Sequence, residues 1–327
     1  MTAGWEVLLE DARWAPSAHN GQQWRLRPLS ADRAELLCDP RRLIPAIDPT
    51  GAFAMASLGA FAETLAVVAR AGGQDVIVSN LSPPPRPDST GLARIADLQM
   101  VAGGSDHLSI DLVRRRRTSR LPYDGHAVAP AVIERLGRAC SSFGHRFEAS
   151  SNPDTVEWSL DLDGTYLIRD LRSNPAREEL ASWLRYSNRS AARQGDGFSP
   201  AAMDVPGWML YALARSGRPL QTRPVGALLR WIHARSVRGT ATIGWLAGPF
   251  STHDDWFAAG RALARTWLEL TAEGLYLQPL GSIIDDRSVN LRLNPQRDGE
   301  VWIVVRIGTG ASPARSHRLS ASELIAP

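Results

Sequence analysis

The stretch Ala15-Pro16-Ser17-Ala18-His19-Asn20-Gly21-Gln22-Gln23-Trp24 is unusually dense in short polar side chains. Pro16 ends any preceding helix, because proline lacks the amide hydrogen that a helix interior needs. The serine, asparagine and glutamine side chains then offer several hydrogen-bond donors and acceptors within one turn. Such a turn can hold a planar polar heterocycle, although most serine- and asparagine-rich turns are only turns.

Alternating strand and helix patterns extend from this turn in both directions. Apolar residues at i, i+3, i+4 and i+7 predict a helix that ends near Arg13. The segment 92–100 is compatible with either a strand or a helix. Helices are expected at 130–142, 153–172 and 175–188, together with one closed by Gly72-Gly73 and one capped by Thr252; strands are expected at 24–29, 34–38, 75–81, 145–149, 241–248 and 301–307.

Composition excludes several classes of site. The chain of 327 residues has 37 basic residues, and all of them are arginine, so no lysine can form a Schiff base or a Walker-A phosphate site. Cys38 and Cys140 stand far apart, which predicts neither a disulfide framework nor a metal site. A net charge of +3 is too small to indicate nucleic-acid binding. We expect a cytoplasmic protein with no nucleic-acid or membrane partner and no bound metal, because no signal peptide or long apolar run is evident.

A run of arginines lies near the middle of the chain, from Arg114 to Arg120. A helix that begins near Asp106 and is closed by Pro122 would carry it. On such a helix Arg116 and Arg120 share a face at i and i+4, with Arg117 and Arg120 as the i, i+3 alternative. Like charges repel one another unless an anion offsets them, so the run is either a solvated basic face or an anion clamp.

Four stretches resemble the nitroreductase family of FMN-dependent oxidoreductases. Residues 16–24 are similar to its "PSxxNxQPW" signature, with Gln23 in place of the usual proline, and 39–49 are similar to the loop that follows the signature in one branch. Residues 116–120 resemble its "RRSxR" phosphate clamp. Residues 274–282 resemble a glycine-containing stretch whose backbone amides approach the flavin, and the region after the last strand resembles the family's closing basic element.

The resemblance implies a role for each matching residue. The proton donors nearest to the flavin would be His19 and Tyr123, although His19 is more often only a hydrogen-bonding loop residue. The noncovalent cofactor FMN would be bound by Ser17, Asn20 and Gln22 at its ring edge, by the backbone of Gly281 and Ser282, and by Arg116, Arg117, Arg120, Arg315 and, as second choice, Arg318 at its phosphate.

The order of the motifs implies two nitroreductase-like halves fused in one chain. Family members usually have the arginine element before the polar turn and share their flavin sites across a homodimer, whereas here the turn comes first. We therefore expect an α+β fold in which an N-terminal half, 1–103, and a C-terminal half, 104–327, form an intramolecular pseudo-dimer with mixed or antiparallel sheets wrapped by helices. One flavin site per chain follows, in a monomer or a homodimer.

Two functions are compatible with this site. The first is an oxidoreductase that transfers a hydride between NAD(P)H or a small organic molecule and FMN, as in nitro or quinone reduction or desaturation. The alternative is a non-catalytic protein that sequesters FMN. The loop-rich segment 189–225 carries Phe198, Trp208, Met209 and Tyr211, and it is expected either to form a lid over the flavin or to pack between helices.

Overall fold

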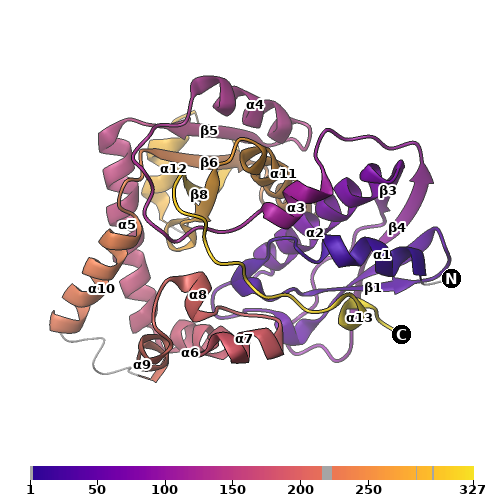
Figure 1. Ribbon diagram of the computed structural model, residues 1–327, viewed down its shortest axis with the longest axis horizontal. Coiled ribbons are helices and arrows are strands. Elements are labelled where there is room, and N and C mark those ends of the chain that lie inside the picture. The colour runs from indigo at the N-terminus through magenta and orange to yellow at the C-terminus, as the bar shows by residue number, and fades with distance from the viewer. Residues whose placement is uncertain (1–2, 216–222, 285, 297) are drawn as a thin grey trace.

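The computed structural model describes residues 3–215, 223–284, 286–296 and 298–327. The described residues form two four-stranded sheets surrounded by helices (Figure 1). Neighbouring strands in both sheets are antiparallel. The expected α+β class is therefore confirmed, with antiparallel rather than mixed sheets.

The two sheets have the same strand order. In each half, a helix of 20 residues follows the second strand along the chain and precedes the third. This helix is α2 (Ala52–Ala71) in the first half and α11 (His253–Ala272) in the second. The first sheet runs β1 (Trp24–Pro28), β2 (Arg33–Cys38), β4 (Ala93–Ala102), β3 (Gln74–Ser79), and the second runs β5 (Arg146–Ser150), β6 (Thr242–Gly248), β8 (Glu300–Gly308), β7 (Tyr276–Pro279). The ambiguous segment 92–100 is thus a strand, and the expected boundary at 103 falls just after β4.

Helices α2 and α11 cross at the centre of the molecule (Figure 1). Glycine makes this crossing close: a Cβ on Gly59 would lie 2.0 Å from the Phe257 oxygen, and one on Gly260 would lie 1.8 Å from the Ala56 oxygen. By length and composition α2 could cross a membrane, but 94% of its most apolar window is buried inside the protein. It is a core helix, and the crossing joins the two halves of the chain.

The remaining helices cover the sheets and form an insertion between β5 and β6. The helix expected at 175–188 ends earlier, at Trp183, because the chain leaves helical geometry at Leu184 and pairs with Phe198 in an isolated bridge. The described helices are α1 (Ala3–Ala12), α3 (Ile110–Arg115), α4 (Pro130–Ser141), α5 (Pro153–Arg172), α6 (Asn174–Trp183), α7 (Asn188–Gln194), α8 (Pro200–Met203), α9 (Gly207–Arg215), α10 (Arg223–Ser236), α12 (Arg287–Leu293), α13 (Ala321–Leu324) and the 3₁₀ turns η1 (Ala18–Asn20), η2 (Pro40–Arg42) and η4 (Gly281–Ile283).

The last segment of the chain returns to the first sheet. The amide of Ala326 donates to the Leu26 oxygen at 2.8 Å, and Ile325 forms a parallel bridge with Leu26. Leu319 and Leu324 are buried in the same hydrophobic core as β1, β2 and α2. The C-terminal residues therefore pack on the N-terminal half, and on the way there they pass the polar turn.

The proposed lid 189–225 divides into parts with different surroundings, and residues 216–222 lie outside the described structure. Phe198 faces His19, with the ring centroids 5.2 Å apart. Trp208 is 70% exposed and Tyr211 is 46% exposed, so they do not cover a buried ring in this structure. Both aromatics lie on an exposed face of α9, whereas Phe198 lies against His19, and the lid over a flavin stays a prediction.

Candidate functional site

The polar turn adopts a tight backbone in which three of four successive residues depart from ordinary geometry. His19, Asn20 and Gln22 have φ values of 52°, 55° and 50°, in the left-handed region that non-glycine residues rarely occupy. The Ser17 hydroxyl accepts a hydrogen bond from the Gln22 amide at 3.1 Å, which closes the turn. Backbone strain of this kind persists only where surrounding contacts hold it, and it is often found at functional sites.

Two side chains of the turn hold distant segments in place. The side-chain nitrogen Nε2 of Gln22 donates to the backbone oxygen of Gly195 at 2.9 Å. Its side-chain oxygen Oε1 accepts from the backbone amide of Leu319 at 2.9 Å. The Asn20 amide nitrogen donates to the oxygens of Gly197 and His317 at 3.1 and 3.0 Å. The turn thereby fastens both the loop before α8 and the C-terminal segment, two contacts that the sequence did not predict.

The arginine run is not a continuous helix. Helix α3 ends at Arg115, and Thr118 then forms a parallel bridge with Leu277 of β7, while the Ser119 amide donates to the Leu277 oxygen at 3.2 Å. The predicted helical spacing of Arg116 and Arg120 is therefore wrong, because pairing with β7 holds this segment extended. Residues four apart also share a side in an extended chain, so both side chains still turn inward and are largely buried.

Four arginines lie near Trp14 and the adjacent C-terminal segment, and we call them the Trp14 cluster. Arg13 also lies over the Trp14 ring, at 5.0 Å, but it is paired with Glu10. Arg315 stacks on the Trp14 ring with its guanidinium carbon 3.1 Å from the ring centroid, and Arg318 approaches the same ring at 5.8 Å. Arg116 donates to the Trp14 oxygen at 2.7 Å. Arg117 donates to the Pro313 oxygen at 2.9 Å, which places it beside the C-terminal segment. Residues about 200 positions apart thus meet as expected for a shared binding site.

The Trp14 cluster forms no ion pair within the described part of the chain, although Asp11 is close enough to Arg315 to act on it electrostatically. Among the described residues, no carboxylate lies within ion-pair distance of these four guanidiniums, whereas neighbouring Arg114 is paired with Asp11 at 2.6 Å. Burial and the proximity of Arg315 lower the pKa of Arg116 to about 9. Burial and the nearby Arg117 lower the pKa of Arg315 to about 10, and burial with Arg116 lowers that of Arg318 well below its usual value. An anion bound among these arginines would offset their mutual repulsion and the cost of burying their charges, and it would raise their pKa values again.

A less charged region adjoins the turn on the side of α8. Arg120 donates to the Ala202 oxygen at 3.2 Å, and its guanidinium carbon lies 5.3 Å from the Phe198 ring. Burial, aided by Arg120, lowers the pKa of His19 to about 4, so the imidazole is neutral near pH 7. Burial raises the pKa of Tyr123 to about 12. Both expected proton donors are therefore uncharged at neutral pH. The proton of Tyr123 is on its hydroxyl oxygen, and that of the neutral His19 imidazole is on one ring nitrogen.

The glycine-containing stretch lies on the other side of the arginine segment. Gly281 begins η4 after β7, and a Cβ added to it would meet nothing within 4 Å, so open space adjoins its backbone. The side chain of Ser282 lies outside the described residues. Leu277, four residues earlier, pairs with the arginine segment at Thr118. A backbone role for Gly281 and Ser282 stays a prediction.

Buried polar atoms without partners also occur along this region. Within the described part of the chain, atoms with no hydrogen-bond partner include His19 Nδ1, Asn20 Oδ1, Tyr123 Oη and Arg315 Nε and Nη2. Buried polar groups are normally paired, and an unpaired one costs about 1–3 kcal/mol. Several orphaned donors and acceptors from separate segments are the pattern that a polar ligand with an anionic end would satisfy.

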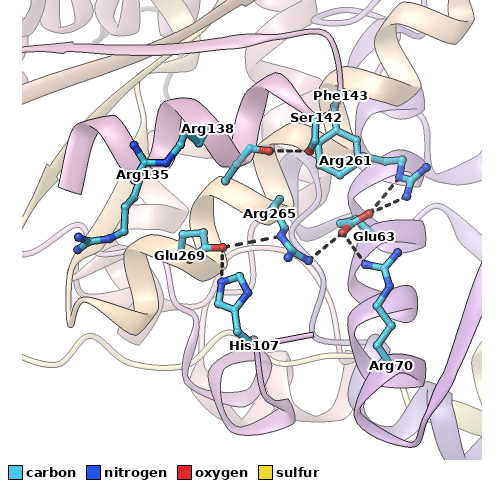
Figure 2. A pocket seen from close by; sticks show the side chains of 11 residues that line it. Glu63, Arg70, His107, Arg135, Arg138, Ser142, Phe143, Arg261, Arg265 and Glu269 are labelled. Carbon is cyan, nitrogen blue, oxygen red and sulfur yellow. Dashed lines mark hydrogen bonds and ion pairs between the residues drawn. The ribbon is translucent and has the colours of Figure 1, made fainter. Parts of the chain in front are cut away.

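A second arginine-rich region shows what a self-neutralised cluster looks like. A cavity of about 610 Å³ is lined by arginines of α2, α4 and α11 (Figure 2). There the buried Glu63 accepts from Arg261 at 2.9 Å and pairs with Arg70 and Arg265 at 3.4 Å. Asp106 also pairs with Arg265. These carboxylates offset the positive charge of the arginines in this cavity. The described arginines of the Trp14 cluster have no such carboxylate partners.

No protein-family model matches the chain. Two uncharacterized proteins of Mycobacterium tuberculosis, from strains CDC 1551 and H37Rv, are each 29% identical over 314 residues, which covers 90% of this chain and 83% of theirs.

Similar solved structures include two proteins called NfnB. One is the FMN- and NADPH-dependent nitroreductase of Sphingopyxis sp. strain HMH, with 14% identity, a TM-score of 0.42 and coverage of 66% of this chain and 96% of that one. The other is the FMN-dependent nitroreductase of Mycobacterium smegmatis in complex with NADPH, with 15% identity, a TM-score of 0.41 and coverage of 65% and 94%.

Sequence reasoning missed Trp14 and Arg306, which shape the site, and named Phe198 only as part of a possible lid. Trp14 is the ring on which the arginines gather, Phe198 covers His19, and Arg306 is fully buried with its guanidinium carbon 4.2 Å from the Tyr123 ring. Trp14 stands directly before the polar turn, and that position was the available signal. The partners of Phe198 and Arg306 come from distant segments, so no local pattern points to them.

Proposed function

We propose that this protein binds one noncovalent FMN per chain and belongs to the nitroreductase-like flavoproteins. The observation that carries the proposal is the Trp14 cluster, four buried or half-buried arginines that have no carboxylate partner among the described residues. A phosphate monoester carries between one and two negative charges at neutral pH and accepts several hydrogen bonds, so it would neutralise such a cluster.

The residues present fit the rest of this cofactor. The isoalloxazine edge needs polar contacts, and His19 Nδ1 and Asn20 Oδ1 are buried and unpartnered beside the turn. Gln22 and the Ser17 hydroxyl would act indirectly, because their polar atoms already hold the turn and its neighbours. The phosphate would bind to Arg116, Arg117, Arg315 and Arg318, while Arg120 stands closer to the ring end.

An oxidoreductase activity is the function that such a site supports best. FMN supplies the hydride chemistry when bound, so this chain needs to position it, exclude water and manage one proton. Tyr123, with its pKa raised by burial and its hydroxyl unpartnered, holds a proton at neutral pH. NAD(P)H and a small nitro, quinone or related organic molecule are the substrates that we propose.

The sequestering alternative is favoured by a different observation. Gly195 and Gly197 are tied to the polar turn by Gln22 and Asn20, and Phe198 lies against His19. A loop fastened in this way would limit access to a ring placed beside His19. Binding of FMN without turnover would then be the function.

The cofactor proposal is tested by purifying the protein and releasing what it binds. We expect a yellow protein with about one FMN per chain, released by heat and identified by mass. A preparation that stays colourless after incubation with FMN, two flavins per chain, or FAD in place of FMN would each contradict the proposal. NADPH consumption with a quinone or nitro acceptor then separates the two functions, since a sequestering protein would leave NADPH unoxidised.

A further inference from the structure

Two helices of the insertion carry the same exposed pattern. On α9, Trp208, Tyr211 and Arg215 stand at i, i+3 and i+7, and on α10 Leu228, Trp231 and Arg235 repeat that spacing. Residues at this spacing share one face of a helix.

These residues are far more exposed than apolar side chains of their size usually are. Trp208 and Trp231 are 70% and 61% exposed, and Tyr211 and Leu228 are 46% and 49% exposed. The Arg215 guanidinium carbon lies 5.1 Å from the Tyr211 ring. Each helix therefore presents aromatic and apolar groups to solvent, with an arginine one turn further on.

Helices α9 and α10 carry no acidic residue of their own, although their neighbours α5 and α6 do. The chain has 34 acidic residues, but none lies between Asp204 and Asp254. Arg215, Arg230 and Arg235 are exposed, and no acidic partner occurs for them among the residues that the structure describes. This is the opposite of the cavity in Figure 2, where arginines and carboxylates alternate.

Exposed tryptophan and tyrosine beside unpaired arginines are the chemistry of a membrane interface. The aromatic rings are amphipathic and prefer the headgroup level, and arginine is attracted to anionic lipid. Both helices lie at one end of the molecule, away from the two termini, so a flat surface can reach them (Figure 1).

We propose that α9 and α10 bind the protein peripherally to an anionic bilayer surface through these aromatic and arginine side chains. The proposal is independent of FMN and replaces the sequence-based expectation of no membrane partner. It requires reversible adsorption and no spanning segment, since the apolar helix α2 is buried.

Vesicle sedimentation tests the proposal on the full chain. We expect binding to vesicles of phosphatidylcholine with about one-third phosphatidylglycerol to be at least tenfold tighter than to phosphatidylcholine alone, since each arginine near an anionic surface contributes a preference of roughly fivefold. The double variant Trp208→Ser, Trp231→Ser should lose about tenfold or more of this binding, and so should Arg215→Gln, Arg235→Gln.

Matched controls come from exposed residues elsewhere. Val7→Ser, Leu29→Ser replaces side chains that are 70% and 60% exposed on the other half and should leave vesicle binding unchanged. Equal binding to both kinds of vesicle would overturn the proposal, and so would unchanged binding by the tryptophan variant. The proposal would also be overturned if the wild-type protein bound no vesicles. A dimer that the tryptophan variant abolishes would then identify the exposed face as an interface between two copies of the chain.

Discussion

At the scale of single residues, the site is marked by arginines that have no carboxylate partner among the residues that the structure describes. Arg114 and Arg315 come from the same arginine-rich surroundings, yet the first is fixed by Asp11 and the second has two unpartnered nitrogens. A buried or half-buried cation without a counter-ion costs free energy. That cost is recovered when an anionic ligand binds, which is why unpaired arginines indicate function more strongly than paired ones.

This contrast gives a matched pair of substitutions. Arg315→Gln should weaken FMN binding by roughly ten- to a hundredfold, because a charge-assisted hydrogen bond is worth on the order of 1.5–3 kcal/mol. Arg114→Gln should change FMN affinity less than about threefold, since its guanidinium is already bonded to Asp11. Fluorescence titration of the apoprotein measures both, and equal losses would mean that the arginines act only as diffuse charge.

His19 should make folding stability depend on pH. Its folded pKa of about 4 lies below the unfolded value of 6.5, so the folded state disfavours the protonated imidazole. This contribution is fully present above about pH 6.5 and is lost as pH falls toward 4, by on the order of 3 kcal/mol in total. When the free energy of unfolding is measured with urea between pH 4.5 and 7.5 and plotted against pH, the slope should be shallower for His19→Gln than for the wild type. Parallel slopes would place the titration on other groups.

At the scale of elements, the arginine segment shows how pairing overrides local pattern. The run from Arg114 to Arg120 has good helix formers, but α3 ends at Arg115 and the next residues lie extended along β7. At the crossing of α2 and α11, helices form even though each contains a glycine of poor helix propensity. The two glycines are required there because the helix backbones touch.

Gly260→Ala tests the crossing. The added Cβ would lie 1.8 Å from the Ala56 oxygen, so the helices must separate, and we expect a loss of about 3 kcal/mol or more in unfolding free energy. Gly4→Ala is the control, because Gly4 is also helical but has nothing within 4 Å of its added Cβ. There the better helix propensity of alanine should stabilise by about 0.5–1 kcal/mol. Chemical denaturation compares them, and a neutral Gly260→Ala would show that the crossing is loosely packed.

At the scale of the whole molecule, the C-terminal segment closes the chain on its beginning. It leaves β8, passes the Trp14 cluster with Arg315 and Arg318, bonds Gln22 through the Leu319 amide and ends against β1. The site is consequently built from the first 25 residues, the middle and the last 15 residues of the chain. Its integrity depends on packing that lies outside it.

Leu324→Ala should therefore affect both stability and binding. Leu324 is fully buried in the core that contains β1 and α2, and its truncation should cost about 2–5 kcal/mol. Because the same segment carries Arg315 and Arg318, FMN affinity should fall as well. Leu291→Ala, at a position 45% exposed, is the control and should change neither quantity. Loss of stability with unchanged FMN affinity would uncouple the tail from the site.

The sequence predicted most elements, and it supplied candidate site residues whose role stays a prediction. The helix that became α11 and its capping box at Thr252, and the strands that became β1, β2, β6 and β8, follow local propensities and start signals that operate within a few residues. The motif resemblance placed Arg116, Arg117, Arg120, Arg315 and, as second choice, Arg318 in one phosphate-binding group. The structure brings four of these arginines together near Trp14 and the C-terminal segment, whereas Arg120 lies beside Phe198 and Ala202. The proposed origin from two fused subunits stays a prediction, although the equal strand order of the two sheets agrees with it.

What the sequence by itself determined is thus the set of elements and the excess of arginine near them, because propensity and composition are local properties. The tertiary structure alone decided which arginines lack a carboxylate, that Gln22 fastens the loop at Gly195 and the tail at Leu319, and that Trp208 faces outward while Phe198 faces His19. Charge pairing and exposure depend on contacts between residues hundreds of positions apart. Such contacts are set by how the sheets, helices and tail pack, and that packing leaves no signature in a short stretch of sequence.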